Sequence, residues 1–177
     1  IVDLNEGAGL EGLQEAIRAD DPDVIGLSLR NIDNLDAFAT KSYIGDFRKA
    51  VAAIRDTTGA KIVLGGSGFT IFPSELMEAL GADYGIAGDG EQFPLLLDTL
   101  AAGGDASRIP GVRIGGCPSA SLPAAANWPF RRHLDVNSPH FQFYLRQGGI
   151  FNLQTKRGCP FRCIYCTYPH IDGGRLR

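Results

Sequence analysis

Short, mostly apolar runs alternate with stretches of helical spacing over the first 103 residues. Such runs are typical of strands buried in a parallel sheet, and they occur at Ile1–Leu4, Val24–Leu29, Lys61–Leu64 and Asp83–Ala87. Between them, apolar residues recur every three or four positions, as in amphipathic helices, in the segments Leu10–Ile17, Phe47–Ile54, Pro73–Leu80 and Phe93–Leu100. The pattern therefore predicts an α/β fold with a doubly wound (flavodoxin/Rossmann-like) parallel sheet.

The periodic pattern ends near Gly104, and several prolines with an alanine run then favour an extended linker. Pro110–Ile114 is expected to add a short edge strand, and Gly149–Gln154 a strand that opens a second domain. We therefore expect a first domain at residues 1–112, a linker at 113–149, and a truncated second domain at 150–177. Because doubly wound sheets usually have five or more strands, we also expect a βα unit to precede Ile1.

The composition is that of a globular protein. Of the 177 residues, 44% are hydrophobic and 21% charged, which is enough apolar material for a buried core. The net charge is −3 and the sequence has no basic run, so electrostatics give no reason to expect nucleic-acid binding. No apolar stretch approaches the ~18 residues of a transmembrane helix, and the first residues lack the features of a signal peptide. We expect a cytoplasmic protein.

Three of the four cysteines lie within eight residues, in the sequence Cys159-Pro-Phe-Arg-Cys163-Ile-Tyr-Cys166. Thiolates clustered on one loop favour metal binding over a disulfide framework. Three of them can hold three irons of a [4Fe–4S] cluster and leave the fourth iron open to a small molecule. This spacing resembles the signature of the radical S-adenosylmethionine (SAM) enzymes. The resemblance implies that the three cysteines bind the cluster, that Tyr165 packs near the adenine of SAM, and that a (β/α) barrel begins here.

A structural zinc site is the alternative for the same cysteines. Zinc usually takes four ligands, and Cys163 and Cys166 form one C-x2-C pair that His170 or Cys117 would complete. Cys117 lies in the expected linker, where a small residue needs no chemical role. His170 lies in a loop, where a histidine is more often an ordinary polar residue than a ligand. The iron–sulfur cluster is therefore the interpretation that we favour.

Polar and glycine-rich sequences follow three of the predicted strands. Because the carboxyl ends of parallel strands meet at one edge of a sheet, where α/β proteins bind ligands, one ligand could contact all three. The candidate binding residues of these loops are Ser28, Arg30, Asn31, Gly65, Gly66, Ser67, Gly68, Gly88, Gly90 and Glu91. A glycine pair after a strand can reflect turn geometry alone, and G-G-S-G is not the dinucleotide-binding pattern G-x-G-x-x-G.

Together with the cysteine motif, these loops resemble the cobalamin (B12)-binding domain that precedes the barrel in one branch of the radical SAM enzymes. Ser28 and the Gly65-Gly66 pair match the serine and double glycine of cobalamin-binding folds, and the sequence at 88–91 matches a G-[DE]-G-E loop of this branch. The resemblance implies that the nucleotide tail of cobalamin lies between sheet and helices. The D-x-H-x-x-G motif, whose histidine binds cobalt in many B12 proteins, does not occur in the sequence. Arg30 and Asn31 are expected nearest the corrin.

The resemblance implies an enzyme that uses a [4Fe–4S] cluster to cleave SAM reductively, most commonly to transfer a methyl group from cobalamin to an unactivated carbon. It also implies a small-molecule or lipid-like substrate and an electron donor such as flavodoxin or ferredoxin. Two alternatives keep the radical chemistry: a cyclisation or rearrangement enzyme, and a cobalamin-free enzyme whose α/β domain is a scaffold. A third, from a different class, is a zinc-stabilised corrinoid- or nucleotide-binding module. We expect these 177 residues to be inactive alone, because most of the barrel is missing.

Overall fold

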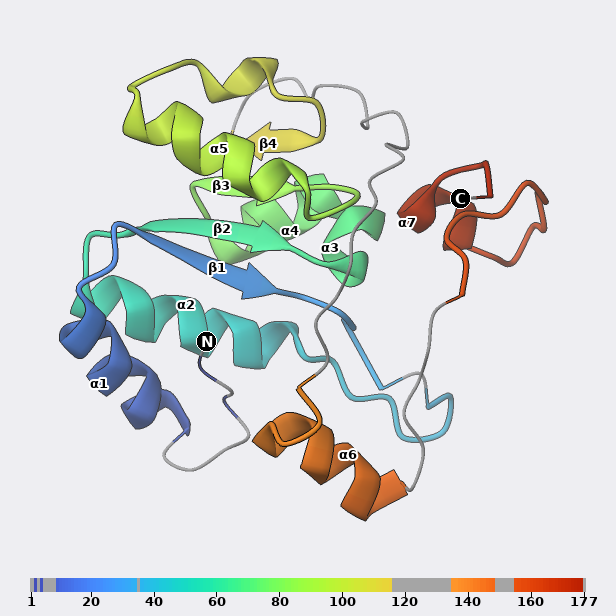
Figure 1. Cartoon of the computed structure of the whole chain (residues 1–177), viewed down its shortest axis with the longest axis horizontal. Coiled ribbons are helices and arrows are strands. Elements are labelled where there is room, and N and C mark those ends of the chain that lie inside the picture. The colour runs from blue at the N-terminus through green and yellow to red at the C-terminus, as the bar shows by residue number, and fades with distance from the viewer. Residues whose placement is uncertain are drawn as a thin grey trace. The chain divides into compact units, whose positions relative to one another are not determined.

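The computed structural model describes residues 2, 4, 9–34, 36–115, 135–148 and 155–176 (Figure 1). The chain divides into two compact units, Ile1–Pro123 and Ala124–Arg177, and each unit is considered by itself. Within the described ranges, no helix has both the length and the apolar character needed to cross a membrane.

The first unit is built on a four-stranded sheet with the strand order β1-β2-β3-β4. The strands are β1 (Val24–Ser28), β2 (Lys61–Gly65), β3 (Tyr84–Ile86) and β4 (Val112–Ile114). The first three are parallel, as predicted. β4 is the expected edge strand, but it runs antiparallel to β3. Residues 102–111 return the chain to the carboxyl end of β3, where the Ala87 N–H donates to the Gly111 carbonyl, so β4 can only run back down the sheet.

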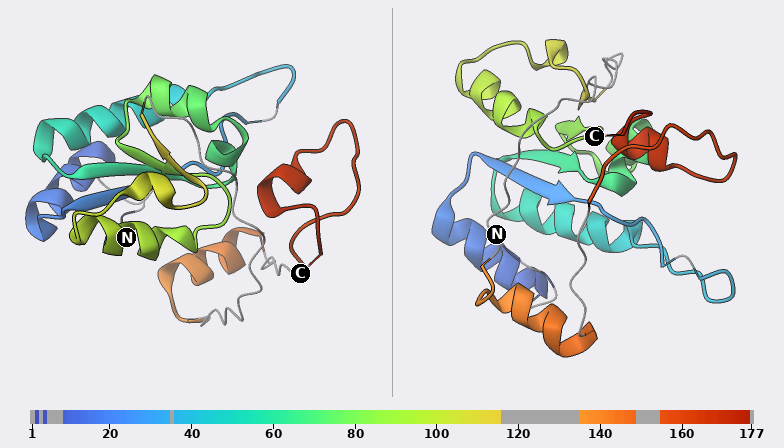
Figure 2. Two further views of the ribbon diagram at one scale, coloured as in Figure 1. Left: turned by 90° about the horizontal axis from the view of Figure 1, so that it is seen from above. Right: turned by 45° about the vertical axis from the view of Figure 1, so that its right-hand side comes forward.

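Helices cover both faces of the sheet, which confirms the doubly wound α/β fold (Figure 2). One face carries α1 (Gly9–Asp20), α2 (Ile44–Thr57), α3 (Ser67–Ile71) and α4 (Pro73–Leu80); the other carries α5 (Gln92–Ala101) and the 3-10 turn η1 (Ala106–Arg108). Neighbouring residues of β2 point to opposite faces. Ile62 and Leu64 therefore belong to the larger core, and Val63 belongs to the core beneath α5.

Two predicted features of the first unit differ from the structure. Of the expected strand Ile1–Leu4, Val2 and Leu4 are described and neither lies in a strand, whereas Ile1 and Asp3 lie outside the described residues. Ser67 and Gly68, expected in a loop, begin helix α3. The next residue, Phe69, is fully buried with its ring against the backbone of Gly85 in β3, and this packing holds the short helix on the sheet.

The described part of the second unit contains helices α6 (Pro139–Gly148) and α7 (Tyr168–Asp172). α6 lies inside the segment that was expected to be an extended linker. Its start has a recognisable signal, because the Ser138 hydroxyl accepts the Phe141 N–H at 3.2 Å and proline is tolerated at the first helical position. The strand predicted at Gly149–Gln154 falls outside the described residues.

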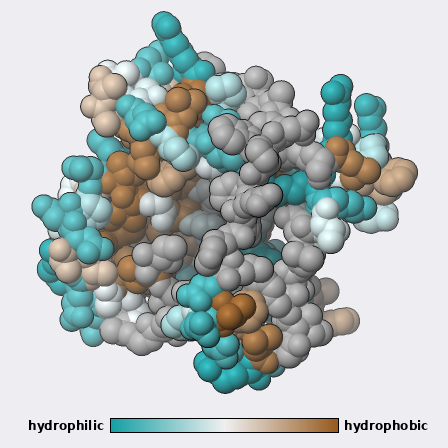
Figure 3. Space-filling view, viewed as in Figure 1, coloured by the Kyte–Doolittle hydropathy of each residue, from teal (hydrophilic) through white to brown (hydrophobic). Residues whose placement is uncertain are grey.

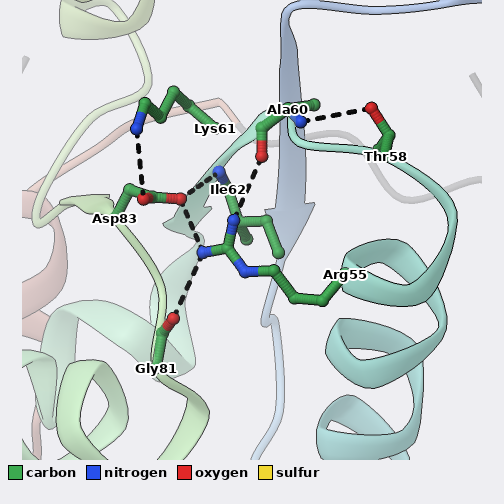
Figure 4. A network of polar contacts seen from close by, with 7 residues as sticks. All are labelled: Arg55, Thr58, Ala60, Lys61, Ile62, Gly81 and Asp83. Atoms are coloured by element: carbon green, nitrogen blue, oxygen red, sulfur yellow. Dashed lines mark hydrogen bonds and ion pairs between the residues drawn. The ribbon is translucent and has the colours of Figure 1, made fainter.

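A charged network fastens the end of the sheet where the parallel strands begin (Figure 4). One Asp83 carboxylate oxygen accepts hydrogen bonds from Arg55 at 2.6 Å and from the Ile62 N–H at 2.8 Å, and the other lies 3.7 Å from Lys61 Nζ. Partial burial raises the pKa of Asp83, but the hydrogen bonds from Ile62 and Arg55 and the two positive charges outweigh it, so this pKa is lowered. The network joins α2, β2 and the start of β3, and leaves the carboxyl ends of the strands free for a ligand.

Candidate functional site

A cavity of about 290 Å³ opens at the carboxyl ends of the three parallel strands. Its walls come from β1, β2, β3, the loops that follow β2 and β3, and the first turn of α5. The lining residues are Gly26, Leu27, Ser28, Val63, Leu64, Gly65, Gly66, Ile86, Gly88, Gly90 and Phe93. Ser28 carries the one polar side chain among these lining residues. Hydrophobic residues also gather on the surrounding face, between β1 and α5 (Figure 3). A ligand here would meet apolar side chains and glycine backbone, which suits an organic molecule.

Five of the predicted binding residues line this cavity: Ser28, Gly65, Gly66, Gly88 and Gly90. They come from all three loops that the sequence analysis singled out. The loops therefore meet at one edge of the sheet, as expected for parallel strands.

The glycines at the end of β2 and just after it differ in how closely other backbone atoms pack against them. Gly66 has φ +96°, and a Cβ there would lie 2.7 Å from the Leu29 carbonyl oxygen. The Gly68 N–H donates to the same oxygen at 2.9 Å, and a Cβ on Gly68 would lie 3.0 Å from it. At Gly65, by contrast, the nearest atom to a Cβ would be the Ile86 carbonyl oxygen at 3.9 Å. Gly66 and Gly68 therefore let two loops pack together, whereas Gly65 leaves open space in the cavity.

Thr70 of α3 ties two of the glycine loops together. It is 7% exposed, and its hydroxyl accepts the Gly88 N–H at 2.9 Å while donating to the Gly66 carbonyl at 3.0 Å. Gly88 itself has φ +98°, a conformation that favours glycine. A buried hydroxyl that both accepts and donates fixes the spacing of the two loops. The β2 and β3 walls of the cavity are therefore held as one unit.

Five other predicted residues of these loops do not line the cavity: Arg30, Asn31, Ser67, Gly68 and Glu91. The Ser67 hydroxyl donates to the Arg30 carbonyl at 2.8 Å, so Ser67, like Gly68, holds the loop that follows β1. Arg30 and Asn31 are exposed on that loop, and Glu91 is half-buried at the N-terminus of α5. The last predicted contact, Tyr165, belongs to the second unit.

Sequence reasoning missed the apolar lining residues, which are Gly26, Leu27, Val63, Leu64, Ile86 and Phe93. One signal could have found part of this wall. A glycine inside a strand often marks the close approach of another group. Gly26 interrupts the apolar run of β1, and a Cβ there would lie 3.6 Å from the Phe93 ring. Phe93 was assigned only to the apolar face of its helix, and in the structure its side chain also lines the cavity.

The three clustered cysteines lie on one loop of the second unit. Cys163 is exposed, Cys159 and Cys166 are half-buried, and all three are free thiols. The Cys166 N–H donates to the Cys163 carbonyl at 3.2 Å, which closes a turn just before α7. The Cys159 N–H donates to the Gly173 carbonyl at 3.0 Å, beyond the end of α7. The loop is therefore closed on itself by its own backbone.

Within the described ranges, no three His, Cys, Asp or Glu side chains converge as a metal site. The donor set nevertheless fits an iron–sulfur cluster, because three free thiols on one loop are the soft ligands that iron takes in such clusters. His170, the candidate zinc ligand, is exposed in α7, where its N–H donates to the Thr167 carbonyl. Cys117 lies outside the described residues.

The sequence profile of the B12 binding domain matches residues 1–97, more than half of the chain. The chain belongs to the B12-binding domain family. The match spans every residue that lines the cavity, from Gly26 to Phe93. The family expected from the serine and glycine loops is confirmed.

Two curated relatives are methyltransferases. The tryptophan 2-C-methyltransferase of Streptomyces laurentii is 25% identical over 91% of this chain and 36% of the relative. An uncharacterised methyltransferase of Pyrococcus horikoshii is 25% identical over 98% of this chain and 38% of the relative. The B12-binding chain therefore spans little more than a third of the length of these relatives.

Two solved structures of the radical SAM methyltransferase TsrM from Kitasatospora setae share the fold. The one with tryptophan and a SAM analogue bound has a TM-score of 0.81 and 29% identity, and the match covers 97% of this chain and 35% of TsrM. The one with cobalamin and a [4Fe–4S] cluster bound has a TM-score of 0.80 and 28% identity, over 97% and 36%. These similarities confirm the relationship to the cobalamin-dependent radical SAM enzymes.

Proposed function

We propose that this chain is part of a cobalamin-dependent radical SAM C-methyltransferase that acts on an unactivated carbon. The observation that carries the proposal is the occurrence, in one chain, of a glycine-lined cavity in a B12-binding domain and a C-x3-C-x2-C loop of free thiols. The similarity to a tryptophan 2-C-methyltransferase supports the reaction class. In this proposal, residues 1–112 form the domain that binds cobalamin, residues 113–149 form the linker, and residues 150–177 belong to the cluster-binding domain.

The cavity would hold the nucleotide tail of cobalamin against β1, β2 and α5. Bound cobalamin would supply a methyl group carried on cobalt. Gly65 leaves space for the tail, the Ser28 hydroxyl offers a hydrogen bond, and Phe93 forms the opposite wall. Arg30 and Asn31, exposed on the loop after β1, are the side chains that we place toward the corrin.

The thiols of Cys159, Cys163 and Cys166 would hold the cluster. A [4Fe–4S] cluster with three cysteine ligands leaves one iron open to SAM and supplies the electron for its reductive cleavage. The side chain of Tyr165 is 87% exposed beside Cys166, so its ring is free to stack on the adenine of SAM. Clustered thiols also suit a reducing, cytoplasmic compartment with a donor such as flavodoxin or ferredoxin.

Cofactor content tests the proposal. The chain is produced in cells supplied with cobalamin, purified without oxygen, and examined by metal analysis and visible spectroscopy. We expect about four irons and about one cobalt per chain. Gly65→Leu should fill the cavity, so this variant should lose cobalt and keep iron. Zinc in place of iron would contradict radical chemistry and support the zinc-stabilised module, and iron without cobalt would contradict the cobalamin half.

Isotope-labelled SAM tests the reaction class in a longer protein that contains this chain. Transfer of the labelled methyl group to a carbon of the product is expected. Release of 5′-deoxyadenosine without labelled product would favour cyclisation or rearrangement instead.

A further inference from the structure

We propose that Gly158, Gly173 and Arg175 form a clasp that positions Cys159 for cluster binding. This inference rests on the proposed function, and it adds positioning residues that lie outside the cysteine motif itself. The clasp brings together the residue that precedes the first cysteine and the segment that follows α7.

Gly158 is the tightly packed half of the clasp. It is buried and has φ +79°, in the left-handed region that favours glycine. A Cβ at this position would overlap the carbonyl oxygen of Arg175 and lie 2.8 Å from its carbonyl carbon. It would also lie 3.1 Å from the Gly173 carbonyl oxygen. These neighbours are all backbone atoms, which cannot turn aside as a flexible side chain can, so only glycine fits here.

The other half of the clasp is a hydrogen bond to the first cysteine. The Cys159 N–H donates to the Gly173 carbonyl at 3.0 Å, and Gly173 has φ +86°. The Gly173 carbonyl therefore packs against Gly158 and also accepts the hydrogen bond from Cys159. Because the backbone of Cys159 sets the direction of its Cα–Cβ bond, the clasp sets where its sulfur can reach.

The other two cysteines have a local constraint of their own. The Cys166 N–H donates to the Cys163 carbonyl, so these two ligands are related by one turn. The Cys159 N–H instead donates to a carbonyl outside the motif, that of Gly173. Groups that orient metal ligands without touching the metal commonly change metal affinity. The clasp would act in this way, by presenting Cys159 to a cluster that the Cys163–Cys166 turn also holds.

Gly158→Ala breaks the clasp, and Gly174→Ala is its matched control. A Cβ on Gly174 would meet no atom within 4 Å, and Gly174 is not among the glycines with positive φ. Both variants and the wild-type chain are reconstituted with iron and sulfide without oxygen, and iron content and iron loss to a chelator are measured. We expect Gly158→Ala to lose iron about tenfold faster than wild type, and Gly174→Ala to match wild type.

A second variant and two further measurements separate the clasp from general unfolding. Gly158→Asn tolerates a left-handed φ better than alanine but keeps the Cβ, so it should fail as alanine does. The electron paramagnetic resonance signal of the reduced cluster should change in Gly158→Ala, because Cys159 is displaced. Cobalamin content should stay at the wild-type level, because every cavity-lining residue lies in the first unit.

The possible failures are distinguishable. Wild-type iron content, iron loss and resonance signal in Gly158→Ala would overturn the clasp and leave the proposed function standing. Recovery of the cluster in Gly158→Asn would overturn the contact with Arg175 as the cause. Failure of the wild-type chain to take up iron would overturn the proposed cluster and, with it, the clasp.

Discussion

Gly65 and Gly66 are neighbours in the sequence, yet a methyl group would have different effects at the two positions. At Gly66 it would press on the Leu29 carbonyl at 2.7 Å in a backbone with φ +96°. We expect Gly66→Ala to lower the free energy of unfolding by about 2 kcal/mol or more, the usual range for a strained left-handed residue. At Gly65 the methyl group would meet only the Ile86 carbonyl, at 3.9 Å. Gly65→Ala should therefore fold normally and bind cobalamin roughly tenfold more weakly, because the cavity is smaller.

Urea unfolding and cobalamin titration, each on both variants, separate these effects. Gly59→Ala serves as the control for both, since Gly59 does not line the cavity, has no positive φ, and a Cβ there would meet no atom within 4 Å. Equal stability of Gly66→Ala and wild type would contradict the close approach of the two loops. Unchanged cobalamin affinity in Gly65→Ala would contradict the placement of the ligand in this cavity.

At the scale of elements, Asp83 links α2, β2 and β3 through Arg55, Lys61 and the Ile62 N–H. Asp83→Asn removes the charge but keeps an oxygen that can accept from Ile62. We expect a loss of roughly 1 kcal/mol at neutral pH, since Arg55 and Lys61 are partly exposed and solvent screens the ion pairs. The pKa of Asp83 lies below its ordinary value of 3.8 in the folded state. The contribution of the charge is therefore complete above pH 3.8 and disappears as the pH falls through the lower folded-state pKa.

Thermal unfolding measured between about pH 2 and pH 7 tests this link. The difference between wild type and Asp83→Asn should be constant near neutral pH and vanish in acid. Asp56→Asn, on the same helix as Arg55 and exposed, should show no such difference. A difference that persists unchanged to the lowest pH would show that the charge of Asp83 is not the cause.

The elements were predictable where one local pattern decides them. The continuous apolar runs at β1 and β2 and the spacing of Phe47, Val51 and Ile54 predicted strands and helix correctly. The direction of β4 was not predictable. It depends on where the preceding residues return the chain to the sheet, and the sequence of the three strand residues does not determine that. Helix α3 was hidden for a similar reason. Its glycine-rich sequence is typical of a loop, and contacts from other parts of the fold stabilise it as a helix, among them the packing of Phe69 on Gly85 and the hydrogen bond from the Gly68 N–H to the Leu29 carbonyl.

In the candidate site, too, some features follow from local sequence and others depend on the tertiary fold. Parallel strands guarantee that the loops after β1, β2 and β3 meet, so Ser28, Gly65 and Gly88 could be predicted to gather. Whether a given glycine lines the cavity or supports a neighbouring loop depends on distances across the fold. Gly68 supports the loop after β1, and nothing in its local sequence distinguishes it from Gly65.

At the scale of the whole molecule, the two candidate cofactor sites belong to different units. The cavity is lined entirely by residues of the first unit, and the three cysteines lie in the second. The two cofactors should therefore be separable. In the triple variant Cys159→Ala, Cys163→Ala, Cys166→Ala, we expect iron to be lost completely while cobalt content and the cobalamin spectrum stay at the wild-type level.

Cys117→Ala is the matched control, since Cys117 lies outside the motif and should leave both metals in place. Metal analysis of the same anaerobic preparations gives both readings at once. Loss of iron in Cys117→Ala would contradict a cluster held by three cysteines. Loss of cobalt together with iron in the triple variant would mean that residues of the second unit also hold cobalamin. The binding of the two cofactors would then be coupled, and the cavity of the first unit would be only part of the corrinoid site.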